Sequence, residues 1–509
     1  MQPVGRPLGA VPRSGGRVAF RVWAPGVHAV AVRVGGDDHD DHPLAREEDG
    51  FWAAEAPAAT SDDYRYVLDG DAYADPCSRF QPEGMRGPSR VVDPTTFAWT
   101  DDGWDGVALD DLVLYELHVG TFSPEGTFDG VVPRLRDLVE LGVTALELMP
   151  VATFPGNRGW GYDGLYAYAP HPAYGGPDGL RRLVDAAHEH GLAVILDVVY
   201  NHVGPGGGEA LAAFGPYFTD RHETPWGDAL DFTQTGVRAW AVENALLWIR
   251  DYHLDGLRLD AVFAIHDEES GEHVLHELAR RVHEENPRAL VIAEQEPGNL
   301  RPIEEWGHDA QWADEFHHEL HVALTGERHG YYARHAGTPS ALARQLEREP
   351  ALRLVYCSQN HDQVGNRPAG DRPAAGELRI RAALTLFAPQ TPLLFQGEEY
   401  GERRPFQYFT DHVDPFFAEA TREGRRREFA FRGDVPDPQA EETFERSQLD
   451  PSAGDDELRA FYRRLLELRR RLPRVMTTDA DDETGTLRLT RGPVTLTANL
   501  RTRTVEIEE

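Results

Sequence analysis

Lysine is absent from this chain of 509 residues, and all 51 of its basic residues are arginine. Without lysine there is no amine to form a Schiff base with a carbonyl substrate or with pyridoxal phosphate. A Walker-type phosphate-binding loop is also excluded, because its motif requires a lysine. The absence removes these enzyme classes, whatever bias in base composition caused it.

Cysteine is scarce, and Cys77 and Cys357 do not have the spacing of metal ligands. We expect both to be buried free thiols, as in a reducing compartment. Residues 1–6 lack the apolar core of a signal peptide, and no run is long and apolar enough to cross a bilayer. These features predict a cytoplasmic protein with no membrane partner.

Positive charge is also in short supply, since 86 acidic residues against 51 basic ones give a formal net charge of -35. A nucleic-acid partner is therefore not expected. The excess of acidic residues predicts a solvated surface. The stretch of Asp and His at residues 37–42 is interpreted as a solvated loop and not as a metal site.

The pattern of the chain divides it into three parts. Residues 17–93 alternate short strand-like segments with turns, which predicts an N-terminal β-sandwich over residues 1–97. From residue 112 strands and helices alternate, which predicts an α/β domain, a (β/α)8 TIM barrel, over residues 98–473. Short strands then return, and residues 474–509 are expected to form a small C-terminal β domain.

The barrel strands are mostly clear, and only the sixth is weak, near residues 310–314. The other seven are expected at residues 113–118, 143–150, 192–197, 256–260, 290–294, 354–356 and 392–395. Helices are expected at residues 133–141, 179–190, 237–251, 271–285, 374–387 and 455–472.

Carboxylates close several of these strands. Asp260, Glu294 and Asp362 each follow a short apolar run, and Asp197 ends another in the same way. Barrel strands point their carboxyl ends into one shared bowl, where barrel enzymes carry out their chemistry. The pattern predicts that acids far apart in the sequence meet around one bond.

Three acids in one bowl suit glycoside hydrolysis, in which one carboxyl group protonates the leaving oxygen and a second attacks the sugar. Arg258 lies two residues before Asp260 and shares its face of the strand, so its charge keeps a nucleophilic carboxylate ionised. His202 and His361 are suitable donors to sugar hydroxyl groups.

Aromatic side chains in a glycine-rich loop after the second strand are candidates for stacking on a sugar ring. Trp160 and Tyr162 could be core residues, but their place in this loop argues against full burial. Asp197 and Asn201 are interpreted as supporting residues that hydrogen-bond the loop and orient His202.

Four stretches resemble the signature regions of the α-amylase superfamily of glycoside hydrolases: residues 197–202 (DVVYNH), 256–260 (GLRLD), 290–294 (LVIAE) and 360–362 (NHD). They occur in order, one for each expected strand. The resemblance implies that Asp260 is the nucleophile, Glu294 the acid/base and Asp362 the stabiliser of the transition state. It also implies that the reacting sugar is bound by Tyr162, His202, Arg258 and His361.

Longer stretches resemble the maltooligosyltrehalose trehalohydrolases of that superfamily, at residues 75–82, 154–163, 311–318, 361–367 and 405–412. This resemblance implies hydrolysis of the α-1,4 bond next to a terminal trehalose, with no cofactor and no required metal. It implies a pathway partner, the maltooligosyltrehalose synthase that makes the substrate, and a carbohydrate-module-like N-terminal domain. Further substrate contacts are expected from Trp160, Phe316, His317, His318, Gln363 and Asn366.

Some features of this resemblance need a structural test. Glu315 stands where the family pattern has Asp, which keeps the charge and lengthens the side chain. The insertion at residues 204–234 is shorter than in amylases that bind structural calcium, so calcium is not expected. His317 and His318 could instead be surface residues of a helix.

Three other functions stay open at this point. A glycogen or α-glucan branching enzyme would use the same covalent intermediate but transfer the glycan to a sugar hydroxyl instead of water. A metal-dependent barrel lyase would use Asp197, Asp260 and Glu294 as Mg²⁺ ligands, although Arg258 would repel the metal. A non-catalytic glycan-binding protein would require an inactive barrel, which the complete set of acids disfavours.

Overall fold

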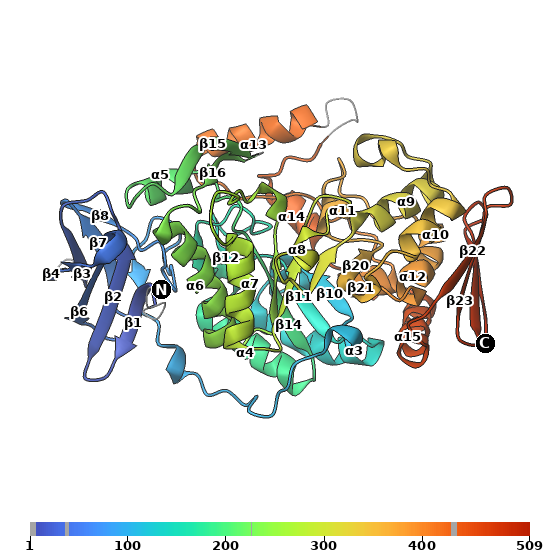
Figure 1. Ribbon diagram of the computed structural model, residues 1–509, viewed down its shortest axis with the longest axis horizontal. Helices are drawn as coiled ribbons and strands as arrows, with labels where there is room; N and C mark the ends of the chain where they lie inside the picture. The colour runs from blue at the N-terminus through green and yellow to red at the C-terminus, as the bar shows by residue number, and fades with distance from the viewer. Residues whose placement is uncertain (1–6, 36–39, 225, 429–434) are drawn as a thin grey trace.

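The computed structural model describes residues 7–35, 40–224, 226–428 and 435–509. A barrel occupies the centre of the molecule, with a β-sandwich at one side and an antiparallel sheet at the other (Figure 1). This arrangement confirms the predicted fold class. No helix within the described ranges is long and apolar enough to cross a membrane.

Eight parallel strands close the barrel in sequence order. They are β10 (Leu114–Leu117), β11 (Ala145–Leu148), β14 (Ala193–Val198), β17 (Gly256–Leu259), β18 (Leu290–Ala293), β19 (Ala310–Trp312), β20 (Leu354–Cys357) and β21 (Thr391–Phe395). The weak sixth strand is therefore present where the sequence predicts it, as β19.

The helices that surround the barrel follow the expected alternation. They include α3 (Leu135–Leu141), α4 (Gly176–Glu189), α6 (Thr235–Asp251), α7 (Val274–Glu285), α9 (Asp314–Thr325), α12 (Leu378–Phe387) and α15 (Asp456–Arg471). Insertions between strands and helices carry α5 (Gly207–Ala212), the hairpin of β15 (Phe218–Thr224) and β16 (Gly227–Leu230), and α13 (Pro415–Glu428). These insertions lie along the same side of the barrel (Figure 1).

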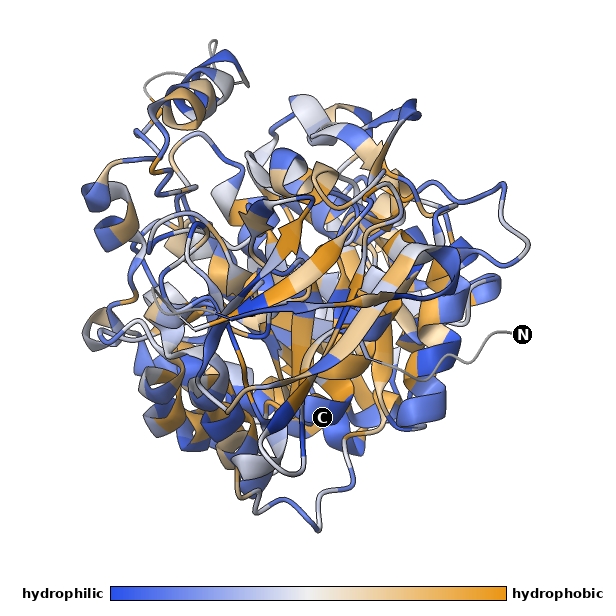
Figure 2. Ribbon diagram, turned by 90° about the vertical axis from the view of Figure 1, so that its left-hand side faces the viewer, coloured by the Kyte–Doolittle hydropathy of each residue, from blue (hydrophilic) through white to orange (hydrophobic). Residues whose placement is uncertain are grey.

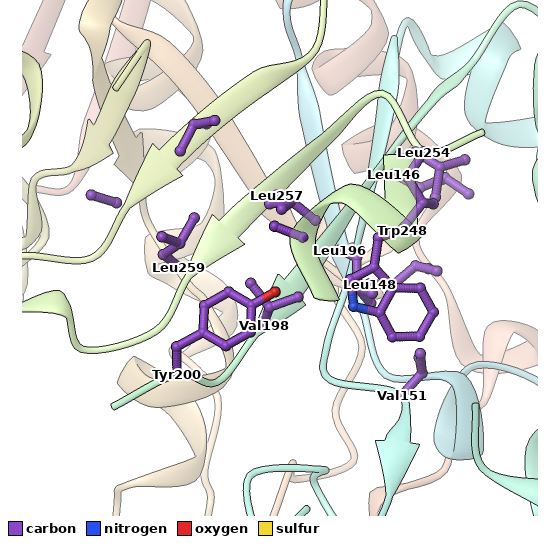
Figure 3. Packing of buried hydrophobic residues seen from close by; sticks show 14 of the residues in the cluster. Leu146, Leu148, Val151, Leu196, Val198, Tyr200, Trp248, Leu254, Leu257 and Leu259 are labelled. Carbon is purple, nitrogen blue, oxygen red and sulfur yellow. The ribbon is translucent and has the colours of Figure 1, made fainter. Parts of the chain in front are cut away.

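The two-residue period of the strands separates the core from the site. Leu148, Leu196 and Leu257 are paired in register and face outward, where Trp248 of α6 packs among the leucines (Figure 3). Each such buried side chain stabilises the fold by roughly 1.5–3 kcal/mol. Asp197, one residue after Leu196, must face the opposite way, into the barrel.

The N-terminal sandwich consists of two antiparallel sheets. One contains β1 (Gly9–Arg13), β2 (Arg17–Trp23), β5 (Ala45–Arg46) and β6 (Phe51–Pro57). The other contains β3 (Val30–Val34), β4 (Asp40–Pro43), β7 (Asp63–Leu68), β8 (Asp71–Tyr73) and β9 (Ser89–Arg90). Seen from this side, apolar segments run along strands while the loops are mostly hydrophilic (Figure 2).

The prediction of a solvated loop at residues 37–42 is wrong for residues 40–42. Asp40 to His42 belong to β4, which pairs with β3, while residues 37–39 lie outside the described residues. The side chain of Arg33 donates to both carboxylate oxygens of Asp41, at 2.7 and 2.9 Å. This cross-strand pair lets an acidic segment form an edge strand.

The C-terminal sheet is a meander of β22 (Thr477–Asp481), β23 (Thr486–Arg491), β24 (Val494–Asn499) and β25 (Thr504–Glu508). The sequence predicts the last three, but β22 (TTDAD) has no apolar alternation and was not predicted. Core-facing side chains do not stabilise β22. It is stabilised by backbone pairing with β23 and by contact with α10 (Pro339–Leu346).

Candidate active site

One buried arginine organises the mouth of the barrel. Nη1 of Arg258 donates to Asp197 Oδ2 at 2.7 Å and to Asp260 Oδ1 at 3.0 Å, and Nη2 donates to Glu294 Oε2 at 2.7 Å. Its guanidinium lies over the ring of Trp312, 4.1 Å from the centroid. Acids from three consecutive strands therefore share one cation. Arg258 faces inward because its neighbours on the strand, Leu257 and Leu259, face outward.

Asp260 is the first residue after β17 and is 7% exposed. Asn201 Nδ2 donates to both its side-chain Oδ2 and its backbone oxygen, each at 2.7 Å. With Arg258 on Oδ1, each carboxylate oxygen accepts a fixed hydrogen bond. These bonds hold the carboxylate in one orientation.

Ala261 connects Asp260 to the neighbouring acid. Its φ of 39° is left-handed, a conformation that costs an alanine about 1 kcal/mol or more. The turn directs the Ala261 N–H to Glu294 Oε2 at 2.9 Å, and the Val262 N–H to the Glu294 backbone oxygen at 3.0 Å. The strained residue fixes the position of Glu294 relative to Asp260.

Glu294 has the environment of a proton donor. Oε2 is bonded to Arg258 and Ala261, whereas no described residue hydrogen-bonds Oε1. Burial raises the pKa of Glu294, and the nearby Asp260 adds to this, although Arg258 opposes the shift. A buried carboxyl group with a raised pKa and one unoccupied oxygen is suited to general acid catalysis.

Asp362 completes the set of predicted acids and is its most exposed member, with a side chain 30% exposed. It is the second residue of α11 (His361–Gly365), whose N-terminus is capped by Asn360. Asn366 Nδ2 donates to Asp362 Oδ1 at 2.9 Å, and His361 Nε2 lies 3.4 Å from the same oxygen. Asn366 therefore contacts the acid itself and orients it.

Glu116 of β10 is a site residue that the sequence reasoning missed. Its Oε1 lies 2.5 Å from His361 Nδ1, and its Oε2 accepts from the His361 backbone N–H at 2.9 Å. Burial lowers the pKa of His361, but the attraction of Asp362 and Glu116 outweighs it and raises the pKa to about 10. A lone acid at an inward position of an apolar strand is the signal that could have identified Glu116.

Tyr162 lies against His361, with ring centroids 5.1 Å apart and planes at 24°. Its hydroxyl donates to Asp197 Oδ2 at 2.5 Å and lies 2.8 Å from His361 Nε2. Burial, opposed by Arg258, raises the pKa of Asp197 to about 7. The half-buried tyrosine is therefore held at two points. Asp197 bonds the loop through Tyr162, and the residue that contacts the ring of His202 is Asn201.

His202 contacts the same loop, with Nε2 3.0 Å from the backbone oxygen of Tyr162. Burial lowers its pKa to about 4, despite the opposing charge of Asp163, so the ring is neutral at pH 7. Trp226 stacks on it, with centroids 4.5 Å apart and planes at 10°, and is 47% exposed. Trp226, in the β15–β16 hairpin, is a second site residue that the sequence reasoning missed.

Trp160 and Phe316, two aromatic residues predicted to contact the substrate, are buried and cannot stack on a sugar. Trp160 is 4% exposed, stacks on Phe406 with centroids 5.1 Å apart, and donates to the backbone oxygen of Gln407 at 3.0 Å. Its ring also packs against Gly365, where a Cβ atom would lie 2.2 Å away. The loop folds back under the bowl, so the expectation that Trp160 avoids burial is wrong.

Phe316 is fully buried on α9 and stacks on Tyr356, with centroids 4.5 Å apart and planes at 3°. His317 is 3% exposed and lines a cavity of 250 Å³ together with Gln363 and Arg381. His318 is 5% exposed and lies 3.4 Å from Gln363 Nε2. The structure therefore brings both histidines near Gln363, whereas Phe316 is packed in the core.

Asp314 is a third residue that was not predicted as part of the site. It follows Trp312, whose ring lies under Arg258 and 5.9 Å from His361. Asp314 is half-buried, and no described residue hydrogen-bonds its carboxyl group. Burial raises its pKa to about 8, and Glu294 and other neighbouring acids add to the shift.

Glu315, the departure from the family pattern, points elsewhere. Its Oε1 accepts from the Gly298 N–H at 2.7 Å and lies 2.8 Å from Arg348 Nη1. The longer side chain therefore bridges the loop after β18 to Arg348, and Asp314 is the acid left facing the bowl.

The geometry disagrees with the metal-dependent alternative. The guanidinium of Arg258 occupies the point where Asp197, Asp260 and Glu294 converge, which is where a shared Mg²⁺ would have to bind. A carboxylate hydrogen-bonded by fixed donors beside a carboxyl group with a raised pKa instead supports acid-assisted displacement at a sugar carbon.

Comparison with known families matches two parts of the chain. Residues 7–93 match carbohydrate-binding module 48, the isoamylase N-terminal domain, and residues 91–207 match the α-amylase catalytic domain. The solved structure of a putative α-amylase from Salmonella typhimurium superposes with a TM-score of 0.88 at 38% identity, covering 96% of this chain and 92% of that one.

Among curated relatives, the malto-oligosyltrehalose trehalohydrolase of Arthrobacter ramosus is 45% identical, over 96% of this chain and 94% of its own length. The 1,4-alpha-glucan branching enzyme of Corynebacterium jeikeium is 32% identical, over 78% of this chain and 62% of its own length. Similarity to the trehalohydrolase is higher and extends over nearly the whole of both chains.

Proposed function

The chain belongs to the malto-oligosyltrehalose trehalohydrolase family, and we propose that it hydrolyses the α-1,4-glucosidic bond next to the terminal trehalose of maltooligosyltrehalose, releasing trehalose. One observation carries the mechanism: a single guanidinium, Arg258, bonds both Asp260 and Glu294. Retaining glycosidases hold their two carboxyl groups about 5–5.5 Å apart, and inverting ones roughly 6.5–9.5 Å. Two acids on one guanidinium fit the retaining separation.

In the first step, Glu294 donates its proton to the glycosidic oxygen while Asp260 attacks the anomeric carbon of the glucosyl unit. The bond to trehalose breaks, trehalose leaves with the proton, and the glucosyl unit becomes an ester of Asp260. Burial raises the pKa of Glu294, which suits it to donate the proton, and the bonds from Arg258 and Asn201 hold Asp260 in position for attack.

In the second step, water replaces trehalose at the mouth of the bowl. Glu294, now ionised, takes a proton from this water, which attacks the anomeric carbon and releases the shortened glucan. Asp362 faces the positive charge that develops on the sugar ring in both steps. His361, a buried cation paired with Glu116, fixes Asp362 and Tyr162.

The sugar that reacts and the trehalose that leaves lie on different sides of the bowl. Tyr162, which follows the second strand, supports the reacting sugar. The sixth strand, β19, lies opposite the second in the closed barrel, and Asp314 follows it. We assign Asp314 to the trehalose side, where its carboxyl group accepts hydrogen bonds from hydroxyl groups of the leaving disaccharide.

The pathway context follows from this substrate. A companion maltooligosyltrehalose synthase must supply the trehalose-capped glucan. A cytoplasmic location is supported by Cys77 and Cys357, which are both free and buried, as expected under reducing conditions.

A product assay tests the function. Trehalose-capped and ordinary maltooligosaccharides are incubated separately with the enzyme, and free trehalose is measured by chromatography. We expect trehalose from the capped substrate only. A shift of the amylose–iodine spectrum without new trehalose or reducing ends would instead identify a branching enzyme, and inertness toward both would identify a binding protein.

A further inference from the structure

A groove of 720 Å³ lies outside the bowl, where the N-terminal sandwich meets the loops of the barrel. Its walls include Met85, Asn157, Leu165, Pro205, His412 and Phe417. None of the acids assigned to catalysis lines it. Its volume falls within the range of 300–1,000 Å³ that is typical of small-ligand sites.

The groove is built from the loops that carry the bowl. Leu165 follows Tyr162 by three residues, and Pro205 follows His202 by three. A stretch of three residues spans at most about 10 Å, so the groove begins within about that distance of the backbones of Tyr162 and His202. It opens on the Tyr162 side of the bowl, opposite Asp314.

Hydrogen bonds join the loops of the groove, and one ion-pair contact links the groove to the bowl. Asp411 accepts from the Asn157 N–H at 2.9 Å and from Arg158 Nη2 at 3.0 Å. The next residue, His412, lies 3.5 Å from the carboxylate of Asp163, which adjoins Tyr162. The groove is therefore held in a fixed position relative to the tyrosine that supports the reacting sugar.

The chemistry of the groove is that of a site for a neutral sugar. Met85, Leu165 and Phe417 supply apolar surface, and Phe417 approaches closely because Gly206 has no side chain in its way. The charged side chains Arg86 and Asp414 lie 3.8 Å apart, and Glu83 adds one exposed carboxylate to the lining. Sugar rings offer apolar faces and polar edges, which such a surface matches.

We propose that this groove binds the glucan arm of the substrate, the α-1,4-linked glucose units on the non-reducing side of the cleaved bond. The proposal rests on the proposed function, because it requires trehalose to leave on the opposite side. It assigns the N-terminal sandwich a direct role, since residues 82–86 form one wall of the groove. The enzyme would then bind long capped substrates more tightly than short ones.

The test compares Phe417→Ala with Phe416→Ala, a matched control at a neighbouring ring that is 74% exposed and does not line the groove. Substrates carry either one or six glucose units on trehalose. For Phe417→Ala we expect KM to rise about fivefold to tenfold with the long substrate and to stay unchanged with the short one. Phe416→Ala should match the wild type with both.

A second variant distinguishes loss of groove binding from a local folding defect caused by removing Phe417. Ala210→Trp fills the groove without removing a contact, and it should produce the same loss for the long substrate alone. Equal losses for both substrates, or no loss with either variant, would overturn the proposal. If the wild type released no trehalose from either substrate, the proposed function would fail instead.

Discussion

Glu116 accepts two hydrogen bonds from His361, one from the ring at 2.5 Å and one from the backbone at 2.9 Å. The two residues are far apart in the sequence, and their pairing keeps the histidine charged inside the barrel. Because His361 also contacts Asp362 and Tyr162, the protonation of this ring affects both sides of the reacting sugar.

Glu116→Gln should therefore lower the pKa of His361 from about 10 toward its ordinary value of 6.5. The raised folded-state pKa contributes stability that is complete below about pH 6.5 and is lost as the pH rises toward 10. The stability deficit of the variant should be largest below pH 6.5 and shrink toward pH 10. NMR titration of the His361 ring and denaturant unfolding across this range measure both effects.

Glu147→Gln is the matched control for that experiment. Glu147 is buried beside Glu116, and burial raises its pKa well above its ordinary value, so the neutral amide is a close substitute for it. The His361 titration should be unchanged in this variant. An equal shift in both variants would mean that Glu116 has no specific role.

Glu294→Gln should reduce kcat for trehalose-capped substrates by about 10²–10⁴-fold without changing the thermal unfolding midpoint by much, because the acid/base is removed. A substrate whose leaving group needs no proton, such as α-maltosyl fluoride, should keep a fast first step. Full activity on the natural substrate would contradict the acid/base assignment.

The pH profile of the wild-type enzyme provides an independent reading of Glu294. The first step requires this residue protonated, so kcat/KM should fall as the pH rises through its pKa. Burial raises that pKa, so the alkaline limb should lie above the ordinary value of 4.5. An alkaline limb at or below pH 4.5 would be inconsistent with Glu294 as the proton donor.

Asp260→Asn should abolish formation of the covalent intermediate and lower kcat by several orders of magnitude. A slow 2-fluoro glucosyl substrate should label the wild type, and mass spectrometry of peptides should locate the sugar on Asp260. The asparagine variant should remain unlabelled. Label on Glu294 or Asp362 would reassign the nucleophile.

Asp314→Ala should weaken recognition of the leaving trehalose. Because burial raises the pKa of Asp314 to about 8, its carboxyl group is largely neutral at pH 7, and loss of this hydrogen-bond partner predicts a fall in kcat/KM of about 10-fold on trehalose-capped substrates. Glu315→Ala changes the adjacent acid, which pairs with Arg348 outside the bowl, and should retain most of the activity. Equal effects of the two substitutions would remove Asp314 from the substrate contacts.

Local sequence pattern was enough to predict the barrel, its flanking β modules, Asp260 and Glu294 at strand ends and Asp362 shortly after the seventh strand. Strand periodicity is local, so it also predicted that Arg258 shares the inward face with Asp260. The weak sixth strand was found because the alternation of strands and helices requires it, although β22, which has no apolar alternation, escaped the same reasoning.

Only the tertiary structure decided which side chains those acids meet. Trp160 and Phe316 occupy motif positions like Tyr162, yet both are buried: the loop of Trp160 folds back onto Gly365, and α9 packs Phe316 against Tyr356. Glu116, Trp226 and Asp314 joined the site through contacts between distant segments, and the groove arose where the sandwich meets the barrel. Burial and charge pairing depend on long-range packing, which local sequence pattern does not specify.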